Sequence, residues 1–437
     1  MLSLIGFATL LTIVILLVTG RVAPIVGLVL IPIIGAFAAG FGVTDIGGFF
    51  EEGIQSVINV VVMFIFAILY FGIMQDAGLF DPLIRRMIAL TSGNVVSIAV
   101  GTVIIAAVAH LDGSGASTFL ITIPALLPLY RRLQMSPYLL LLLVGASASV
   151  VNMFPWAGPL GRTSAVLNIN PTELWKPLIP IQITGLLLVI VLAIFLGVRE
   201  KRRIAKLQST PTTEYHDSEE TATDEKKDES LARPKLLWFN LLLTLGVIAA
   251  LVEGTIPAEY TFMIGVSIAL IVNYPKVSDQ MARIRAHASS ALLMASIILA
   301  AGSFLGILKG SGMLDSIATD LVTILPAFIA PILHVIIGIF GVPFDLILST
   351  DAYYFALLPV VEQIASSHGI AATSTAYAMI VGNIIGTFVS PLAPAVWLAI
   401  GLAKVEMGGH IRYSFPWMWG LSIVLMAFAF LFGIITL

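Results

Sequence analysis

Long apolar segments, separated by short polar ones, cover most of this 437-residue chain. A helix needs about 20 apolar residues to cross the hydrocarbon core of a bilayer. By that measure the pattern predicts ten spans, near residues 2–19, 23–41, 57–76, 137–168, 177–198, 237–252, 259–274, 288–308, 371–400 and 414–436. The fourth and ninth are longer than one crossing requires, and proline and glycine interrupt both. We therefore expect each of these two to be a broken helix.

Two further apolar stretches, 94–132 and 323–366, have a polar break in the middle. We predict that each is a re-entrant hairpin whose tip stops inside the membrane. The basic residues agree with this topology, because ten spans and two hairpins, with both termini outside, place 19 of the 22 lysines and arginines on the cytoplasmic side. Cytoplasmic loops of membrane proteins carry such an excess of positive charge. The three exceptions are Arg162, Lys176 and Lys309.

Composition agrees with a multi-pass membrane protein, because 59% of the residues are hydrophobic and only 11% are charged. Eighteen of the charged residues fall between positions 199 and 235. The segment 199–236 has too few large apolar residues to fold alone, and we predict that it is a cytoplasmic linker. The chain has no cysteine, which excludes disulfides, thiolate metal sites and cysteine nucleophiles.

The parts of the chain on either side of this linker are similar to each other. "FGIMQDAGLFDPL" from Phe71 matches "LGILKGSGMLDSI" from Leu305, and "PALLPLY" from Pro124 matches "FALLPVV" from Phe355. Five crossings per half is an odd number, so the second repeat is inverted across the membrane. Inverted repeats with broken helices are typical of secondary transporters. We predict an all-α polytopic membrane protein of two inverted repeats, each with five transmembrane helices and one re-entrant hairpin.

The polar breaks of the hairpins hold the first candidate functional residues. Backbone groups at membrane depth must find partners away from lipid, so a polar, glycine-rich break indicates a protein-lined or watery cavity. The two breaks contain Asp112, Gly113, Ser114, Gly115, Ser117 and Thr118, and then Asp345, Ser349, Thr350 and Asp351. The three aspartates are the only acids at membrane depth in this topology, and such acids are candidates for ion or proton binding. Alternatively, an aspartate caps the helix that follows it.

The broken spans supply the remaining polar groups. They are Asn152, Trp156 and Arg162 in the first half and Asn383, Thr387 and Ser390 in the second. Arginine stays charged and binds carboxylates through paired hydrogen bonds, so Arg162 indicates an anionic substrate. Alternatively, it pairs with one of the hairpin aspartates. His110 and His334 lie on the first arms of the hairpins, where histidine either relays protons or packs as a neutral, hydrogen-bonded side chain.

The same motifs carry a resemblance to a known family. "HLDGSGASTFLITIPALLPLYRRLQMSP", "NMFPWAGPLGR" and "PFDLILSTDAYYFALLPV" resemble the citrate/divalent-metal:proton symporters (CitMHS) of the ion transporter superfamily, along essentially the whole chain. The resemblance implies proton-driven uptake of citrate, complexed with a magnesium-like or calcium-like ion, across a bacterial cell membrane. It implies no cofactor, because the metal is cargo. Ser114 departs from the family pattern, in which a second acid often stands there, and this leaves the metal preference and the proton count open.

Residues and resemblance together give one candidate site. Substrate contacts are expected at Ser114, Gly115, Ser117, Thr118, Asn152, Trp156, Arg162, Ser349, Thr350, Asn383, Thr387 and Ser390. The metal is expected at Asp112, Asp345 and Asp351, directly or through citrate, and proton coupling at Asp112, Asp345 and His110. The superfamily also implies an elevator mechanism in a homodimer. Scaffold helices would occupy 1–92 and 237–322, and transport-domain hairpins with broken and final helices would occupy 93–198 and 323–437.

Other functions are compatible with parts of this pattern. A carrier of another organic anion, such as gluconate or a C4-dicarboxylate, needs the same fold and differs only in cargo. An intramembrane aspartyl protease needs a G-x-G-D arrangement, whereas the order here is D-G-S-G. A channel fits two closed tips that face opposite sides less well than alternating access does. The sequence has no P-loop, nucleotide-binding or metalloenzyme spacing, so we expect neither an enzyme nor a nucleic-acid partner.

Overall fold

The computed structural model describes residues 1–437 except 19–20, 80, 83–85, 87–93, 209–230 and 325–327. The described residues form helices and turns, without a strand. A chain in lipid must satisfy its backbone groups internally, and helices do so within one segment. Within the described residues, six helical segments are long and apolar enough to cross a membrane: Val43–Asp76, Val95–Asp112, Pro171–Lys206, Pro234–Glu253, Val277–Gly310 and Met407–Leu431.

The described helices of the first half lie before, within and after the first hairpin. The leading helices are α1 (Leu2–Val18), α2 (Pro24–Ala38) and α3 (Val43–Asp76). The hairpin consists of α5 (Val95–Ala109), the 3-10 turn η1 (His110–Asp112) and α6 (Gly115–Arg132). It is followed by α7 (Pro137–Val151), α8 (Gly158–Leu167), α9 (Pro171–Trp175), η2 (Lys176–Leu178) and α10 (Ile179–Gln208).

The described elements of the second half also lie before, within and after a hairpin. Its leading elements are η4 (Pro234–Leu236), α11 (Leu237–Glu253), α12 (Ala258–Asn273), α13 (Val277–Gly310) and α14 (Met313–Ile324). The second hairpin consists of η5 (Ala330–Ile332), α15 (Leu333–Ile339), α16 (Gly341–Phe344), the π-helix η6 (Ala352–Leu357) and α17 (Leu358–Ser366). It is followed by α18 (Ala372–Ile384), α19 (Pro394–Ala403) and α20 (Met407–Leu431).

Several helices extend beyond the predicted spans. Helix α3 begins at Val43 rather than near 57, α13 begins at Val277 rather than near 288, and α10 continues to Gln208, ten residues into the predicted linker. Hydropathy identifies only the part of a helix that crosses lipid, whereas a helix continues into water wherever polar residues are compatible with it. Most of the predicted linker, residues 209–230, lies outside the described residues, as do residues 325–327 of the second predicted hairpin.

Both overlong spans are broken helices, as the sequence predicts. Helix α7 ends at Val151 and α8 begins at Gly158, while α18 ends at Ile384 and α19 begins at Pro394. Proline stands within the first two residues of α8 and of α19, where its missing N–H costs nothing. Nearly every residue of α7 and α18 is buried, so these two helices lie in the interior of the molecule.

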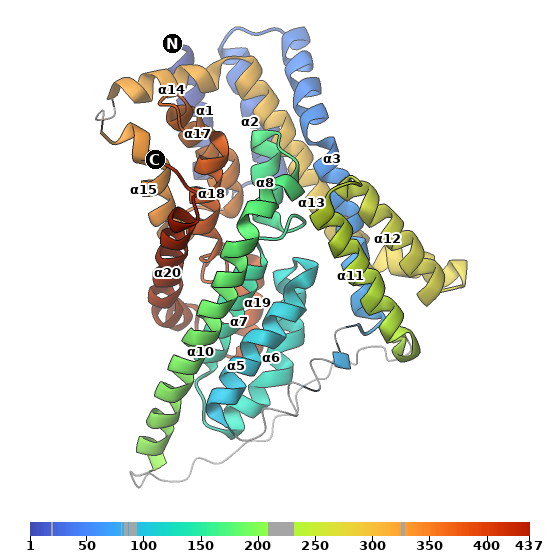
Figure 1. Cartoon of the computed structure of the whole chain (residues 1–437). Coiled ribbons are helices and arrows are strands. Elements are labelled where there is room, and N and C mark those ends of the chain that lie inside the picture. The colour runs from blue at the N-terminus through green and yellow to red at the C-terminus, as the bar shows by residue number, and fades with distance from the viewer. Residues whose placement is uncertain (19–20, 80, 83–85, 87–93, 209–230, 325–327) are drawn as a thin grey trace.

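Helices α3 and α13 form the most extensive helix pair and pass between α11–α12 and the rest of the molecule (Figure 1). Their backbones approach closely where glycines meet. A Cβ atom at Gly53 would lie 2.1 Å from the carbonyl oxygen of Gly302, and one at Gly306 would lie 2.1 Å from that of Phe49. Small residues allow such crossings between membrane helices, and this one joins the two halves of the chain.

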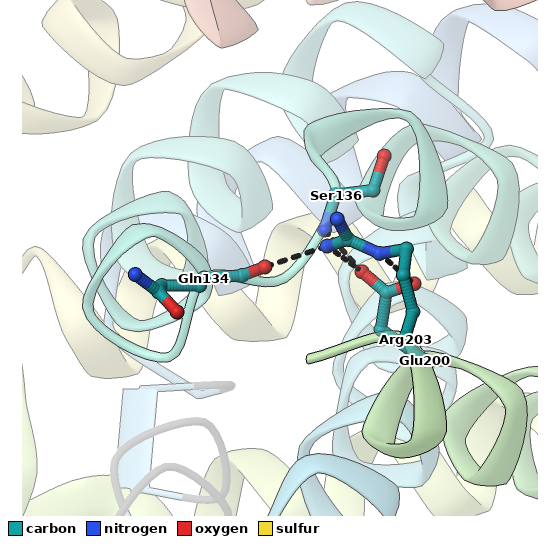
Figure 2. A network of polar contacts seen from close by, with 4 residues as sticks. All are labelled: Gln134, Ser136, Glu200 and Arg203. Atoms are coloured by element: carbon teal, nitrogen blue, oxygen red, sulfur yellow. Dashed lines mark hydrogen bonds and ion pairs between the residues drawn. The ribbon is translucent and has the colours of Figure 1, made fainter. Parts of the chain in front are cut away.

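The end of α10 is fixed to the turn between α6 and α7, which places the first hairpin relative to the final helix of its half. Figure 2 shows the buried Glu200 accepting a hydrogen bond from the backbone N–H of Ser136 at 2.6 Å. Arg203 donates to Glu200 at 2.7 and 3.0 Å and to the carbonyl oxygen of Gln134 at 2.6 Å. Gln134 is in the left-handed conformation, with φ of 57°, so these bonds stabilise a tight turn.

Candidate functional site

The tip of the first hairpin is closed by its own polar side chains. Gly113 has a φ of 71°, in the left-handed region that favours glycine, and a carboxylate oxygen of Asp112 accepts from the N–H of Ser114 at 2.8 Å. Ser114 is the N-cap of α6 and accepts from the N–H of Ser117 at 3.3 Å. The alternative that an aspartate acts as a cap therefore holds in part, because Ser114 caps the helix and Asp112 closes the turn before it.

His110 connects both arms of this hairpin to the first broken span. Its Nδ1 lies 2.7 Å from the hydroxyl of Thr118, and its Nε2 lies 3.3 Å from the amide oxygen of Asn152. All three side chains are buried. The predicted residues His110, Thr118 and Asn152 are thus brought together, although they come from three separate helices or turns. His334, by contrast, bonds the carbonyl oxygen of Thr436 at 3.0 Å, near the C-terminus.

Trp156 packs against the tip of the first hairpin. Its indole N–H donates to the carbonyl oxygen of Leu111 at 2.8 Å, and its ring stacks on Phe154 and Phe71 with centroid distances of 4.6 and 5.0 Å. Only 2% of Trp156 is exposed. The ring therefore packs beneath the turn within an aromatic cluster.

The second tip contains a buried carboxyl group with a spare oxygen. Asp345 is 1% exposed, and its Oδ2 has no hydrogen-bond partner within the described part of the chain. Ser390 donates to the backbone carbonyl of Asp345, and the side-chain amide of Asn383 donates to the carbonyl oxygen of Gly341 at 3.1 Å. The Oδ1 of Asn383 is likewise buried without a partner. A buried polar atom without a partner is costly, which marks this point as a candidate for binding a proton or another cation.

The start of the second arm differs from that of the first. Ser349 accepts from the N–H of Ala352 at 3.2 Å, so a serine caps this arm as well. The arm then continues as a π-helix, a form that is rare and frequent at functional sites. Thr350 follows the cap at a half-buried position. Thr387, in the second broken span, bonds only the nearby carbonyl of Ile384, at 2.8 Å.

One ion pair joins the two halves of the chain at the site. The Nε of Arg162 on α8 lies 2.7 Å from a carboxylate oxygen of Asp351, directly before η6. The two side chains are only 10% and 11% exposed. The guanidinium also lies over the ring of Phe355, 6.0 Å from its centroid. Of the two alternatives that the sequence leaves open for Arg162, the structure shows pairing with a hairpin aspartate.

This pairing uses only part of the guanidinium. Its two Nη groups have no hydrogen-bond partner in the described part of the chain, and they are not among the fully buried atoms that lack one. Gly158 makes room for them, because a Cβ atom there would lie 2.5 Å from Nη1. Arg162 therefore has donors left for a carboxylate. Sequence reasoning missed Gly158, although a glycine one helical turn before an arginine indicates such a close approach.

The tip of the first hairpin packs against the second half of the chain. A Cβ atom at Gly115 would lie 2.5 Å from Cε1 of Phe388 and 3.1 Å from Cβ of Ala395. Ser149 on α7 donates to the carbonyl oxygen of Ile385 at 3.1 Å, in the second break. The described residues hold no group of three or more histidine, aspartate or glutamate side chains that would bind a metal ion.

Comparison with known proteins agrees with these features. The chain matches the family model described as "Citrate transporter" over residues 4–382. It is 38% identical to two Bacillus subtilis proteins over their whole lengths, "Citrate transporter" and "Mg(2+)/citrate complex secondary transporter". It also shares its fold with the Alcanivorax borkumensis YdaH transporter, with a TM-score of 0.61 and 16% identity over 90% of this chain and 88% of that one. The sequence and the relatives together show that the chain belongs to the citrate transporter (CitMHS) family, whose members are transporters and not enzymes.

Proposed function

We propose that this chain is a secondary active transporter that takes up citrate as a complex with a divalent metal ion, driven by protons. Membership of the citrate transporter family supports citrate as the anion. The B. subtilis relative named for the Mg(2+)/citrate complex supports a metal ion as part of the cargo. The apolar helices and the family make the chain a multi-pass membrane protein, and we place it in the cell membrane.

The observation that carries this proposal is the partly used guanidinium of Arg162. A buried arginine with free Nη groups beside a helix break is suited to bind a carboxylate. Citrate carries about three negative charges at neutral pH, and moving each against an inside-negative potential costs about 2.3 kcal/mol per 100 mV. A bound divalent cation removes two of those charges. The scarcity of basic residues at the site is therefore compatible with a metal complex.

Proton coupling is the finer part of the proposal. Asp345 offers a buried carboxyl oxygen that has no partner among the described residues, and a protonated carboxyl group is much less costly to bury than a carboxylate. Asp112 and His110 are the other candidates, but both already bond neighbouring groups of the first hairpin. We therefore assign the coupling proton to Asp345 first.

We also propose that the two halves are inverted repeats that work as an elevator. The helix bounds support the repeat: α3 and α13 each have 34 residues and begin 234 residues apart, and α1 and α11 each have 17 residues and begin 235 apart. Helices α1–α3 and α11–α13 would form the scaffold of a homodimer. The hairpins would be re-entrant, with both termini outside and the linker in the cytoplasm.

Uptake of radiolabelled citrate into proteoliposomes tests the function. We expect uptake to need both a divalent cation and an inward proton gradient. Uptake that is unchanged by EDTA would remove the metal from the proposal, and uptake unaffected by a protonophore would remove the proton. Competition with unlabelled gluconate and C4-dicarboxylates checks the anion, because stronger inhibition by one of these than by citrate would change the assigned substrate.

A further inference from the structure

The ion pair between Arg162 and Asp351 is electrically neutral on its own. Each side chain is nearly buried, and each is the other's only charged partner in the described part of the chain. The pair is also incompletely bonded, since Arg162 uses only Nε and Asp351 only one carboxylate oxygen. Both groups therefore have bonding capacity left for a ligand.

A ligand of one charge sign cannot occupy this pair without leaving a buried charge unpaired. A bare carboxylate that binds the Nη groups of Arg162 adds a second negative charge beside Asp351, which one guanidinium does not neutralise. A bare metal ion that binds the remaining oxygen of Asp351 adds positive charge beside the guanidinium. An uncompensated charge at a nearly buried site is strongly unfavourable.

We infer that the Arg162–Asp351 pair selects ligands that bring both charges, a carboxylate for Arg162 and a divalent cation for Asp351. The two charges of the ligand then compensate each other beside a pair that is itself neutral. This inference rests on the proposed function and explains why the cargo is the metal complex and not the free anion. Asp351 would supply one oxygen ligand to the cation, and the carboxylates of the bound anion would supply further ones.

The corresponding positions in the other half hold no ion pair. Counting from the alanine that precedes each half-helix, Arg162 on α8 corresponds to Leu398 on α19. Counting from the serine that caps each second arm, Asp351 corresponds to Ala116. Both halves therefore have a helix and a hairpin arm at the corresponding positions, but only one of the two contacts carries charged side chains.

Binding of citrate to the purified full-length chain in detergent, measured by calorimetry, tests the inference. The probes are citrate with EDTA, citrate with MgCl2, and MgCl2 alone. For the unmodified chain we expect the affinity for citrate to rise at least about tenfold when magnesium replaces EDTA. In Asp351→Asn, the neutral amide no longer needs a cation, so citrate with EDTA should bind within about threefold of citrate with MgCl2.

Two further variants keep the test decisive. Asp315→Asn removes an exposed acid on α14 that bonds Gln363 and should keep the full magnesium dependence. Arg162→Gln/Asp351→Asn is neutral at the pair and tests the same point if Asp351→Asn does not fold, because its weak binding should no longer depend on magnesium. Magnesium dependence that persists undiminished in either Asp351 variant overturns the inference. If the unmodified chain binds citrate with neither addition, the proposed function fails instead.

Discussion

Helices α8 and α19, which follow the breaks in the two broken spans, each contact the hairpin of the opposite half. The two helices have similar backbone geometry, but the side chains at the two contacts differ. Helices α8 and α19 each have ten residues, follow an extended alanine, carry proline near the start and end at a left-handed residue with φ of 54°. Helix α8 meets the second hairpin through Arg162 and Asp351. Helix α19 meets the first hairpin through Ala395 and Gly115, small residues that pack beside Phe388.

The difference separates what forms the fold from what performs the chemistry. Close packing of small residues is sufficient to dock α19 on the first hairpin. The charged contact contributes binding groups, and it is also where the helical geometry is irregular, since α15 and α16 are short and η6 is a π-helix. In the first hairpin the polar side chains bond one another, and the helical geometry is more regular than in the second.

The largest effect is expected from breaking the charged contact on one side only. Arg162→Met leaves Asp351 without a counter-ion, which should lower the free energy of unfolding by about 3–5 kcal/mol and abolish citrate uptake. Adding Asp351→Leu removes the stranded charge and should recover most of the stability but no uptake. Thermal unfolding in detergent and proteoliposome uptake measure the two quantities. A single variant as stable as the unmodified chain would show that the pair is not buried as described.

The apolar contact should be disrupted by size and not by charge. In Gly115→Leu the new side chain would collide with Phe388, so we expect a loss of about 1–3 kcal/mol in stability together with reduced uptake. Phe388→Ala in the same chain makes space and should restore part of both. If the second substitution makes stability worse, the two residues do not oppose each other in the working protein.

A smaller and more selective effect is expected at Gly158. The methyl group of Gly158→Ala would displace the end of the Arg162 side chain, which can move, so stability should change by less than about 1 kcal/mol. The KM for citrate should rise about tenfold, because the Nη groups are displaced. Gly246→Ala on α11 is the matched control, since nothing lies within 4 Å of its new methyl group. An equal KM in both variants would argue against carboxylate binding at Nη.

The smallest effects should come from the serine caps, where the two hairpins are alike. Ser114→Ala and Ser349→Ala each remove one acceptor for a backbone N–H at a helix start. Each should lower the free energy of unfolding by about 1 kcal/mol. Chemical denaturation of the two variants side by side provides the comparison. A much larger loss at one position would mean that its serine also bonds groups outside its own arm.

Much of the fold was predictable because its signals are local. The run of apolar residues identifies a span wherever it lies in the chain, and proline with glycine identifies the breaks after Val151 and Ile384. The polar tips were predictable for the same reason, since Asp112 and Ser114 close a turn with neighbours within three residues. The full lengths of α3, α10 and α13 were not predictable, because hydropathy does not identify the polar part of a helix beyond its apolar segment.

The sequence by itself therefore determined the apolar helices, the positions of the helix breaks and the polar residues available for chemistry. Only the tertiary structure decided how those residues pair. Arg162 and Asp351 are 189 positions apart, and Gly115 meets Phe388 across the two halves. Such contacts depend on how whole helices pack, and no periodicity in the chain records which of three aspartates an arginine will reach. The physical reason is that the hydrophobic pattern of a segment determines the structure of that segment alone, whereas an ion pair depends on which side chains the packed helices bring close together.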